Sequence, residues 1–541
     1  MNGADLFAQC LKARGVEWVS TLCGHGLNEI YAACLRAGLQ LIDVRNEQTA
    51  AYMAECAGRL SGRVGVCAVS SGVAHANALT GVLNAHFDGA PMLLVTGCGP
   101  LATRGMGHFQ DFDQVALAAP ICKYAEAMTR PERIPEYVHR AWEAALSGRP
   151  GPVHLTFPMN VQTAAVAEGW VAGGRPVRHP QPPTATDLKR AADLLAACER
   201  PLVVAGSGAY YAGAEAALAE FASAFATPVC APIWDRGAVP GPLDEFVGVV
   251  GAASGGPELL ADADLLMLLG AAADYRVNYL QGLAGVIRVD ADAQRLGELR
   301  GVDLEVAADP GLFLTGLTEA CIERQMRGFE VWLGQVQRRR DNYCALIRKG
   351  GQAAAAQRGG LHALDIMGVL DAVLDPEDVV VVDGGNIGQW FHQTLARQRY
   401  PGHWLSCGGS GVVGYGIGGA MAARLLFPRR RVVLLSGDGS ATFNLTDLEC
   451  AARQRLPFLM VVADDESWGI TEVGHRERYG KAMSSHLGPV DFAAVARGLG
   501  ALGVRVDSAA ELEEVLQRGL AEPVPALVHV PVVGGLPGQE G

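Results

Sequence analysis

The stretch GDGSATFNLTDLECAARQRLPFLMVVADD, residues 437–465, decides the fold. The run RVVLLS before it and the run FLMVVA inside it are continuously apolar, which is typical of parallel strands buried on both faces. A helical stretch separates the two runs, so the segment predicts a strand–helix–strand unit. Asp438 follows the first strand and Asp465 the second, and the ends of neighbouring parallel strands meet in one crevice.

The same alternation of apolar runs and Ala-rich helical stretches fills the chain of 541 residues. It predicts an α/β fold made of doubly wound parallel sheets. Stretches rich in Gly, Pro, Thr or Ala at 168–186 and 350–360 predict linkers. We therefore expect three domains, over residues 1–165, 186–340 and 360–541. The other strand candidates are VGVCAVSS, PMLLVTG, PVHLTFP, PLVVAGSG, DLLMLLG, GVIRVDAD, DVVVVDGG and PALVHVPVV.

Two stretches suggest that the first and third domains are related folds. Residues 54–72, AECAGRLSGRVGVCAVSSG, combine a small-residue helix, a basic turn, an apolar strand and Ser-Gly. Residues 419–439, GAMAARLLFPRRRVVLLSGDG, have the same order. Any two α/β units share part of this order, so an accidental likeness is the alternative.

Composition excludes several classes of protein. Half of the residues are hydrophobic and 19% are charged, which is typical of globular domains. The net charge of −13 offers no basic footprint for nucleic acid or an anionic membrane. We see neither an apolar run long enough to span a membrane nor a signal-peptide pattern. The 13 scattered cysteines include no CxxC pair, so we expect reduced thiols in a cytoplasmic protein.

The two acidic strand ends predict a site for phosphate and magnesium. The glycines beside Asp438 allow the backbone to approach an anion, and the N–H groups that follow can bind phosphate. Asp438 and Asp465 offer oxygen ligands for a hard cation, and Mg²⁺ prefers a few carboxylates together with phosphate oxygens. Gly-Asp-Gly alone is compatible with a simple tight turn, and the second acidic strand end favours a functional site.

This pattern resembles the signature of thiamine-diphosphate-dependent enzymes, in which Asn-Asn follows Gly-Asp-Gly after a further strand. Here 24 residues separate Gly439 from Asp464. The resemblance implies that Asp438, Asp465 and the Ser467 carbonyl hold the metal ion. Asp464 and Asp465 replace both asparagines, and added negative charge beside a diphosphate is unfavourable unless the metal or a nearby donor offsets it. The resemblance implies coenzyme contacts also for Gly385, Asn386, Gly437, Gly439, Ser440, Trp468, Gly469 and Ile470.

Residues 409–414 match GxGxxG, a motif of dinucleotide-binding folds. Such a site needs a strand before the glycines and an acidic ribose ligand further on. The preceding HWLSCG is a poor strand, and Asp438 already belongs to the metal motif. The thiamine family has a glycine-rich loop at this place. It implies that the Gly411 carbonyl accepts a hydrogen bond from the aminopyrimidine and that Val413 supports the bent coenzyme.

Glu47 is the candidate for the carboxylate that activates the coenzyme. It lies in RNEQTA, residues 45–50, where the family has Arg-His-Glu-Gln-x-Ala. In the family this carboxylate binds the aminopyrimidine, which then deprotonates the thiazolium carbon for attack on a carbonyl. A glutamate stabilising the first turn of a helix is the alternative. By the same resemblance, Gly72 and Asn77 in SSGVAHAN contact the coenzyme.

Further polar residues are candidates for the substrate pocket. Gln110 in GHFQDFDQ resembles the family's glutamine that donates to the reacting carbonyl, and a surface glutamine is the alternative. His25, in the loop LCGHG, could shuttle a proton or bind substrate, or be a structural hydrogen bonder. His108 is a weaker candidate for catalysis. We expect His75 and His86 to be packed helix residues.

The middle domain resembles the Rossmann-like domain of acetolactate synthases and their relatives. Some members bind FAD or an adenine nucleotide there. Gly206, Gly208 and Asp290 lie where a nucleotide could bind, but Ala272 replaces the arginine of the flavin motif, although Arg276 remains. We expect a structural domain, with a bound nucleotide as the less favoured alternative.

The resemblance covers nearly the whole chain and is nearest the acetolactate synthase and benzaldehyde lyase branch. Residues 466–469, Glu-Ser-Trp-Gly, are like those of the lyase. Gly474 stands near the place where acetolactate synthases carry a tryptophan, which disfavours the usual biosynthetic synthase. The end of the chain, PVVGGLPGQEG, has no basic tail for CoA, so a 2-hydroxyacyl-CoA lyase is a less favoured alternative.

The predicted function is therefore a lyase or transferase dependent on thiamine diphosphate and Mg²⁺. It would cleave or ligate a carbon–carbon bond of a small 2-keto acid, acyloin or aldehyde through an acyl-carbanion equivalent. Glu47 and Asp438 lie far apart in the chain, and one coenzyme must contact both. The resemblance implies a homodimer or homotetramer with active sites at the subunit interface. Two hypotheses compete with this function: a non-catalytic relative, supported only by Asp464-Asp465, and a flavin or nicotinamide oxidoreductase.

Overall fold

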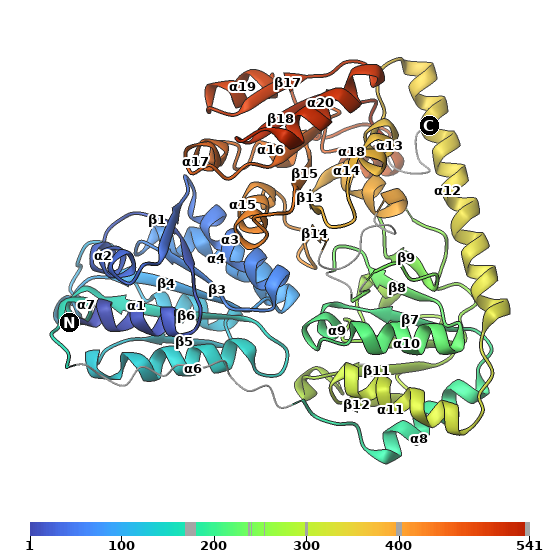
Figure 1. Ribbon diagram of the computed structural model, residues 1–541, viewed down its shortest axis with the longest axis horizontal. Helices are drawn as coiled ribbons and strands as arrows, with labels where there is room; N and C mark the ends of the chain where they lie inside the picture. The colour runs from blue at the N-terminus through green and yellow to red at the C-terminus, as the bar shows by residue number, and fades with distance from the viewer. Residues whose placement is uncertain are drawn as a thin grey trace.

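The computed structural model describes residues 1–167, 180–235, 238–239, 241–253, 255–297, 301–395 and 403–535. Within these ranges the chain forms three six-stranded sheets, and all paired strands in them run parallel. The predicted α/β class is confirmed. Figure 1 shows the first domain at the lower left, the middle domain at the lower right and the third domain at the top.

The first sheet has the strand order β2-β1-β3-β4-β6-β5. Its strands are β1 (Trp18–Leu22), β2 (Gln40–Asp43), β3 (Gly65–Val69), β4 (Met92–Cys98), β5 (Tyr124–Ala127) and β6 (Pro152–Pro158). The helices of this domain are α1 (Gly3–Ala13), α2 (Asn28–Arg36), α3 (Glu47–Ser61), α4 (Val73–Asp88), α5 (Gln114–Ala118), α6 (Ile134–Leu146) and α7 (Met159–Thr163).

The third sheet has the corresponding order, β14-β13-β15-β16-β18-β17, as the prediction of related outer domains requires. Its strands are β13 (Val379–Asp383), β14 (Trp404–Ser406), β15 (Val432–Gly437), β16 (Leu459–Asp464), β17 (Leu502–Arg505) and β18 (Ala526–Pro531). The helices are α13 (Ala363–Val373), α14 (Gly385–Trp390), α15 (Gly416–Leu426), α16 (Asp438–Ala441), α17 (Asp447–Arg453), α18 (Gly469–Tyr479), α19 (Phe492–Gly498) and α20 (Ala509–Ala521).

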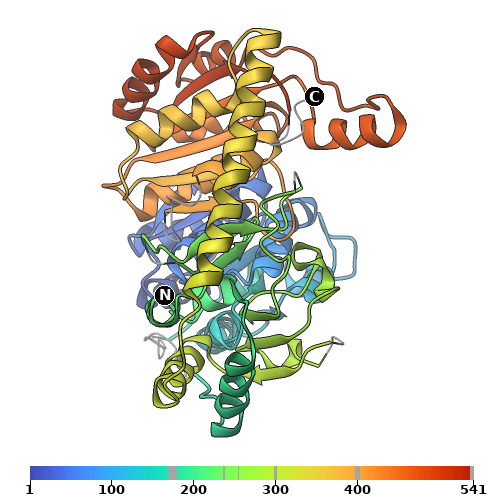
Figure 2. The same cartoon turned by 90° about the vertical axis from the view of Figure 1, so that its right-hand side faces the viewer.

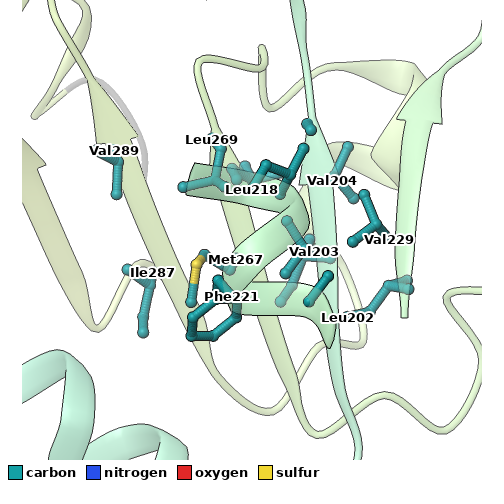
Figure 3. Packing of buried hydrophobic residues seen from close by; sticks show 14 of the residues in the cluster. Leu202, Val203, Val204, Leu218, Phe221, Val229, Met267, Leu269, Ile287 and Val289 are labelled. Atoms are coloured by element: carbon teal, nitrogen blue, oxygen red, sulfur yellow. The ribbon is translucent and has the colours of Figure 1, made fainter. Parts of the chain in front are cut away.

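The middle sheet has the order β12-β11-β10-β7-β8-β9, which is the doubly wound order of dinucleotide-binding folds. Figure 3 shows Leu218 and Phe221 of α10 beside the strand residues Val203, Met267 and Leu269, all of which are buried in one core. The strands are β7 (Pro201–Ala205), β8 (Val229–Pro232), β9 (Phe246–Val250), β10 (Leu265–Leu269), β11 (Val286–Asp290) and β12 (Leu304–Ala307), with helices α8 (Ala185–Ala197), α9 (Ser207–Tyr211), α10 (Glu215–Phe225) and α11 (Pro310–Glu323).

The two predicted linkers have different outcomes. In the first, residues 168–179 lie outside the described part of the chain. The second prediction, at 350–360, is wrong for most of its length, because α12 (Glu330–Arg358) continues through it. The Ala and Gln residues of this stretch are strong helix formers and outweigh Gly350 and Gly351, the two glycines of the stretch that lie inside the helix. Figures 1 and 2 show α12 as a long helix that runs along one side from the middle to the third domain.

The outer domains share a hydrophobic core. Buried residues of α3 and α15 belong to one cluster, and the helices approach closely at Gly418. A Cβ atom there would lie 3.2 Å from the Tyr52 Cβ and 3.1 Å from the Thr49 carbonyl oxygen. This contact fixes the first domain against the third domain of the same chain. In the described part of the chain, no helix combines the length and apolarity that crossing a membrane requires.

Candidate active site

A cavity of about 220 Å³ lies at the carboxyl ends of β13, β15 and β16. Strand ends at such a place are the usual ligand site of open parallel sheets. The structure places in this one cavity every coenzyme or metal residue that the sequence predicted in the third domain. They are Gly385, Asn386, Gly411, Val413, Gly437, Asp438, Gly439, Ser440, Asp465, Ser467, Trp468, Gly469 and Ile470.

Glycines shape the floor of the cavity because no side chain fits at these positions. A Cβ atom on Gly439 would lie 2.7 Å from the Trp468 ring. Gly384 has a φ of +64°, and a Cβ atom on it would lie 2.0 Å from the Ser440 hydroxyl. The glycine backbone therefore borders the cavity directly, which allows an anion to approach backbone N–H groups.

Asp438 is buried, Asp465 is half-buried, and the two carboxylates form an acidic pair. Burial, and then the charge of Asp465, raise the pKa of Asp438 to about 7. Burial also raises the pKa of Asp465, although its carboxylate accepts hydrogen bonds from Asn386 Nδ2 at 2.6 Å and from Ser467 Oγ at 3.2 Å. A divalent cation would offset this repulsion, so the donor set fits a magnesium ion.

The described residues contain no group of three or more His, Cys, Asp or Glu side chains that could hold a metal ion. A cation between Asp438 and Asp465 would therefore need other oxygen ligands, such as a backbone carbonyl and phosphate oxygens. This agrees with the predicted contribution of the Ser467 carbonyl and of a diphosphate. The Asn386 Oδ1 atom is buried without a hydrogen-bond partner at the same place.

Asp464 has a separate partner, which sequence reasoning missed. Its Oδ2 atom lies 2.7 Å from Nε2 of the fully buried His529. Burial disfavours the charged form, but the hydrogen bonds from His529 and from the Glu466 backbone hold the pKa of Asp464 below its usual value. His529 lies on β18 next to β16, 65 residues further along the chain. The added charge that the sequence placed beside the diphosphate is thus offset by a nearby donor.

Glu47 begins α3 in the first domain, at the carboxyl end of β2. Asn46 caps the helix by accepting a hydrogen bond from the Gln48 N–H at 2.9 Å. Asn77 Nδ2 donates to Glu47 Oε2 at 2.7 Å and to Asn46 Oδ1 at 3.0 Å. The structure therefore brings together two of the residues predicted to contact the coenzyme, Glu47 and Asn77.

Gln110 and Gly72 also lie together in the first domain. Gln110 has a φ of +58°, and its Oε1 accepts a hydrogen bond from Ser71 Oγ at 2.7 Å. A Cβ atom on Gly72 would lie 2.8 Å from the Gln110 Cβ. The loop that carries Gln110 thus packs directly on the turn between β3 and α4.

The histidines differ in their surroundings. The His25 ring lies 5.2 Å from the Phe109 ring and 5.7 Å from the His108 ring, next to the Gln110 loop. His75 is fully buried on α4, where burial lowers its pKa to about 4, so its prediction as a packed helix residue is confirmed. The same prediction is wrong for His86, which lies on an exposed face of α4.

Within one chain, Asp438 lines the cavity and Glu47 does not. The described residues that line the cavity come from the middle and third domains, and none comes from the first domain. Glu47, Asn77, Gln110 and His25 therefore do not reach the cavity of their own chain.

The GxGxxG segment lies between a strand and a helix, contrary to the expectation for HWLSCG. That segment contains the short edge strand β14, and α15 begins at Gly416. The strand was missed because it has only three residues and is followed directly by Cys-Gly. Its loop nevertheless faces the cavity through Gly411 and Val413.

The middle-domain glycines are needed for packing between loops. Cβ atoms on Gly206 and Gly208 would each lie 2.7 Å from backbone atoms of Gly270. Asp290 accepts a hydrogen bond from the Asp292 N–H at 2.9 Å. Arg276 pairs with Asp274 at 2.8 Å. These contacts account for the motif residues without a nucleotide, and the expectation of a structural domain stays a prediction.

Comparisons with known proteins give one consistent family. Models described as thiamine pyrophosphate enzyme N-terminal TPP binding domain, central domain and C-terminal TPP binding domain match residues 1–117, 188–317 and 383–530. The acetolactate synthase large subunit IlvG of Mycobacterium tuberculosis is 30% identical, over 98% of this chain and 95% of its own length. The probable acetolactate synthase large subunit of Methanocaldococcus jannaschii is 28% identical (98% and 92%), and 2-hydroxyacyl-CoA lyase 2 of Caenorhabditis elegans is 27% identical (96% and 87%).

Proposed function

Because this chain belongs to the thiamine pyrophosphate enzyme family, we propose that it is a carbon–carbon lyase or carboligase acting on a 2-keto acid, acyloin or aldehyde. The observation that carries the proposal is the acidic pair Asp438 and Asp465 in a glycine-lined cavity at two neighbouring strand ends. The names of the relatives, a synthase and a lyase, support this reaction class.

The third domain would bind the diphosphate end of the coenzyme. Asp438, Asp465 and the Ser467 carbonyl would hold Mg²⁺, which in turn binds phosphate oxygens. Backbone N–H groups beside Gly439 and the Ser440 hydroxyl would donate to the phosphates. When bound, thiamine diphosphate supplies a nucleophilic carbon and an electron sink.

The first domain would supply the groups that move protons. Glu47 would hold a proton against the aminopyrimidine nitrogen, and the hydrogen bond from Asn77 fixes the orientation of its carboxylate. Gln110 would donate to the carbonyl oxygen of the substrate. His25 lies beside the Gln110 loop and is the candidate for a second proton carrier or substrate ligand.

A complete site requires a second copy of the chain, because Glu47 does not reach the cavity of its own chain. Exposed apolar side chains support such an interface. Around Gln110, Met106 is 76% exposed and Phe109 is 64% exposed. Beside the cavity, Phe443 is 51% exposed and contacts the Trp468 ring. We infer a dimer in which each first domain faces the partner's cavity, and a tetramer of two dimers would keep the same sites.

Mixing two inactive variants tests the shared site. In a mixed dimer of Glu47→Gln and Asp438→Asn chains, one site keeps both native carboxylates. A random equimolar mixture should therefore recover about a quarter of wild-type activity. Each variant alone, refolded or co-purified in the same way, is the control. No recovery in a verified mixed dimer would refute the intersubunit site.

The substrate class is tested with purified protein, thiamine diphosphate and Mg²⁺. We expect calorimetric binding of the coenzyme and coenzyme-dependent conversion of at least one member of a panel of 2-keto acids, aldehydes and acyloins. A 2-hydroxyacyl-CoA belongs in the panel, because a lyase of that name is among the relatives. A chain that neither binds the coenzyme nor turns over any panel member would favour a non-catalytic relative.

The hydrogen bond between Asp464 and His529 reduces the support for the hypothesis of a non-catalytic protein. That hypothesis rested only on the replacement of two asparagines by Asp464 and Asp465. A cytoplasmic location is supported by the cysteines, all 13 of which are free thiols in the structure.

The sequence PVVGGLPGQEG, in which a basic tail for CoA is lacking, includes residues 536–541, and these six residues lie outside the described part of the chain.

A further inference from the structure

A buried group of polar and charged side chains lies on α3 and α4 of the first domain. Arg59 and Asp88 form an ion pair at 3.0 Å, and the Arg59 side chain has no solvent exposure. Glu55 lies one helical turn from Arg59 and accepts a hydrogen bond from Asn84 Nδ2 at 2.5 Å. Buried charges of this kind are unfavourable unless each has a partner, so these side chains hold one another in place.

The same group binds the third-domain loop that follows β14. Arg59 Nη1 donates to the Ser406 carbonyl oxygen at 2.8 Å. The Gly409 N–H donates to Asp88 Oδ1, also at 2.8 Å. Ser410 Oγ donates to Asn84 Oδ1 at 2.5 Å. Ser406, Gly409 and Ser410 of the loop are thus all hydrogen-bonded to the first domain of the same chain.

Gly408 shows how tightly the loop approaches Asp88. Its φ is +84°, and a Cβ atom on it would lie 2.1 Å from Asp88 Oδ2. Arg276 of the middle domain lies near the same point, with its Nη2 atom 3.8 Å from a Cβ atom built on Gly409. Its charge is paired with Asp274 and Asp235. The start of the loop therefore lies where all three domains meet.

The other end of the loop is fixed within the third domain. Asp383, at the end of β13, accepts hydrogen bonds from the Gly414 N–H at 3.0 Å and the Gly416 N–H at 2.9 Å. Between the two fixed ends, Gly411 and Val413 line the cavity. A Cβ atom on Gly411 would meet nothing within 4 Å, so this stretch has open space in front of it.

We propose that Arg59 and Asp88, supported by Glu55 and Asn84, are positioning residues that hold the Ser406–Gly411 loop in place for the coenzyme. The first domain then has two tasks. Through α3 and α4 it shapes the cavity of its own chain, and through Glu47 it completes the cavity of the partner. The identity of the ligand rests on the proposed function, whereas the attachment of the loop does not.

The test compares two buried carboxylates, each paired with an arginine. Asp88→Asn removes the charge that pairs with Arg59 and weakens the attachment to the loop, and Asp378→Asn, which affects the pair with Arg431 elsewhere in the third domain, is the matched control. Both variants should lower the melting temperature. Only Asp88→Asn should weaken thiamine diphosphate binding at fixed Mg²⁺, by about tenfold in calorimetry. Wild-type affinity in Asp88→Asn, or an equal loss in both variants, would overturn the proposal.

Hydrogen exchange of the apoprotein gives a readout that needs no coenzyme. Amides of residues 404–416 should exchange faster in Asp88→Asn than in the wild type, with the rest of the third sheet unchanged. If Asp88→Asn does not fold, Ser410→Ala removes the contact with Asn84, together with the hydrogen bond from the Val412 N–H at 3.3 Å, and should give a smaller increase in the same peptide. Unchanged exchange would refute the attachment. A wild-type chain that does not bind the coenzyme would refute the proposed function instead, and the exchange result would still decide the attachment.

Discussion

The sheets of the first and third domains share one strand order, yet the residues at their strand ends differ in chemistry. After β15 and β16 the third domain carries glycines, the buried Asp438 and the half-buried Asp465. At the corresponding edge, the first domain carries the carboxylate of Glu47 together with the amides of Asn77 and Gln110. The shared topology provides a crevice at the strand ends, and the loop residues decide what each crevice can bind.

Under the proposed function, this difference would divide the coenzyme between the two domains. A pair of like charges suits a metal-bound diphosphate, because a cation relieves their repulsion. A single carboxylate held by an amide suits hydrogen bonding to a neutral ring. The comparison can be tested by replacing a carboxylate with the corresponding amide in each domain. Coenzyme binding and turnover are then measured separately.

The largest effect is expected from Asp438→Asn. Loss of a metal ligand should weaken coenzyme binding and slow turnover, each by more than about 100-fold, or about 10⁴-fold together. Calorimetry and steady-state kinetics over a range of Mg²⁺ concentrations measure both. Asp507→Asn, at an exposed aspartate of the same domain that pairs with Arg505, is the control. We expect it to change affinity by less than about threefold. Equal losses in both variants would contradict a specific role of Asp438.

Glu47→Gln should separate binding from catalysis. The amide can still accept the hydrogen bond from Asn77, so coenzyme affinity should stay within about threefold of the wild type. Turnover should fall by about 10²–10³-fold, since the amide cannot exchange a proton with the ring. Glu132→Gln, an exposed change in the same domain, serves as the control. Full activity with every substrate in Glu47→Gln would refute its role.

The smallest effect concerns the pH dependence of stability at Asp383, which accepts hydrogen bonds from the Gly414 and Gly416 N–H groups at the end of the loop that follows β14. Burial raises its pKa from 3.8 to about 7, although the Gly416 and Gly414 N–H groups favour the charged form. The native state therefore binds this proton more tightly than the unfolded chain. Between about pH 4 and pH 7, this contribution to the free energy of unfolding should fall as pH rises.

Asp383→Asn should remove that slope. Denaturant unfolding of both proteins from about pH 5 to about pH 8 should show the wild type losing its advantage over the variant as pH rises. Asp507→Asn, a change at an exposed aspartate of the third domain, is the control. Parallel stability curves for wild type and Asp383→Asn would show that this carboxyl does not titrate in the range.

Each continuous apolar run that was predicted as a strand forms one, because such runs are buried whatever their neighbours are. In the described part of the chain, seven other strands were not predicted, namely β1, β5, β8, β9, β12, β14 and β17. β14 is an edge strand of three residues, which leaves little pattern. The stretch at 350–360 was misjudged because helix-forming alanines outweigh its glycines. The sequence did not predict the partner of Asp464, because His529 is brought next to it only by the pairing of β16 with β18.

The sequence by itself determined the elements and the chemistry of each strand end, because hydrophobic period, glycine turns and carboxylates act locally. Only the tertiary structure decided which residues meet. It joined Asp438 to Asp465, gave Asp464 its histidine, and placed Arg59 and Asp88 against a loop more than 300 residues away. These contacts depend on how sheets and helices pack across domains, and that packing cannot be predicted from the spacing of residues along the chain.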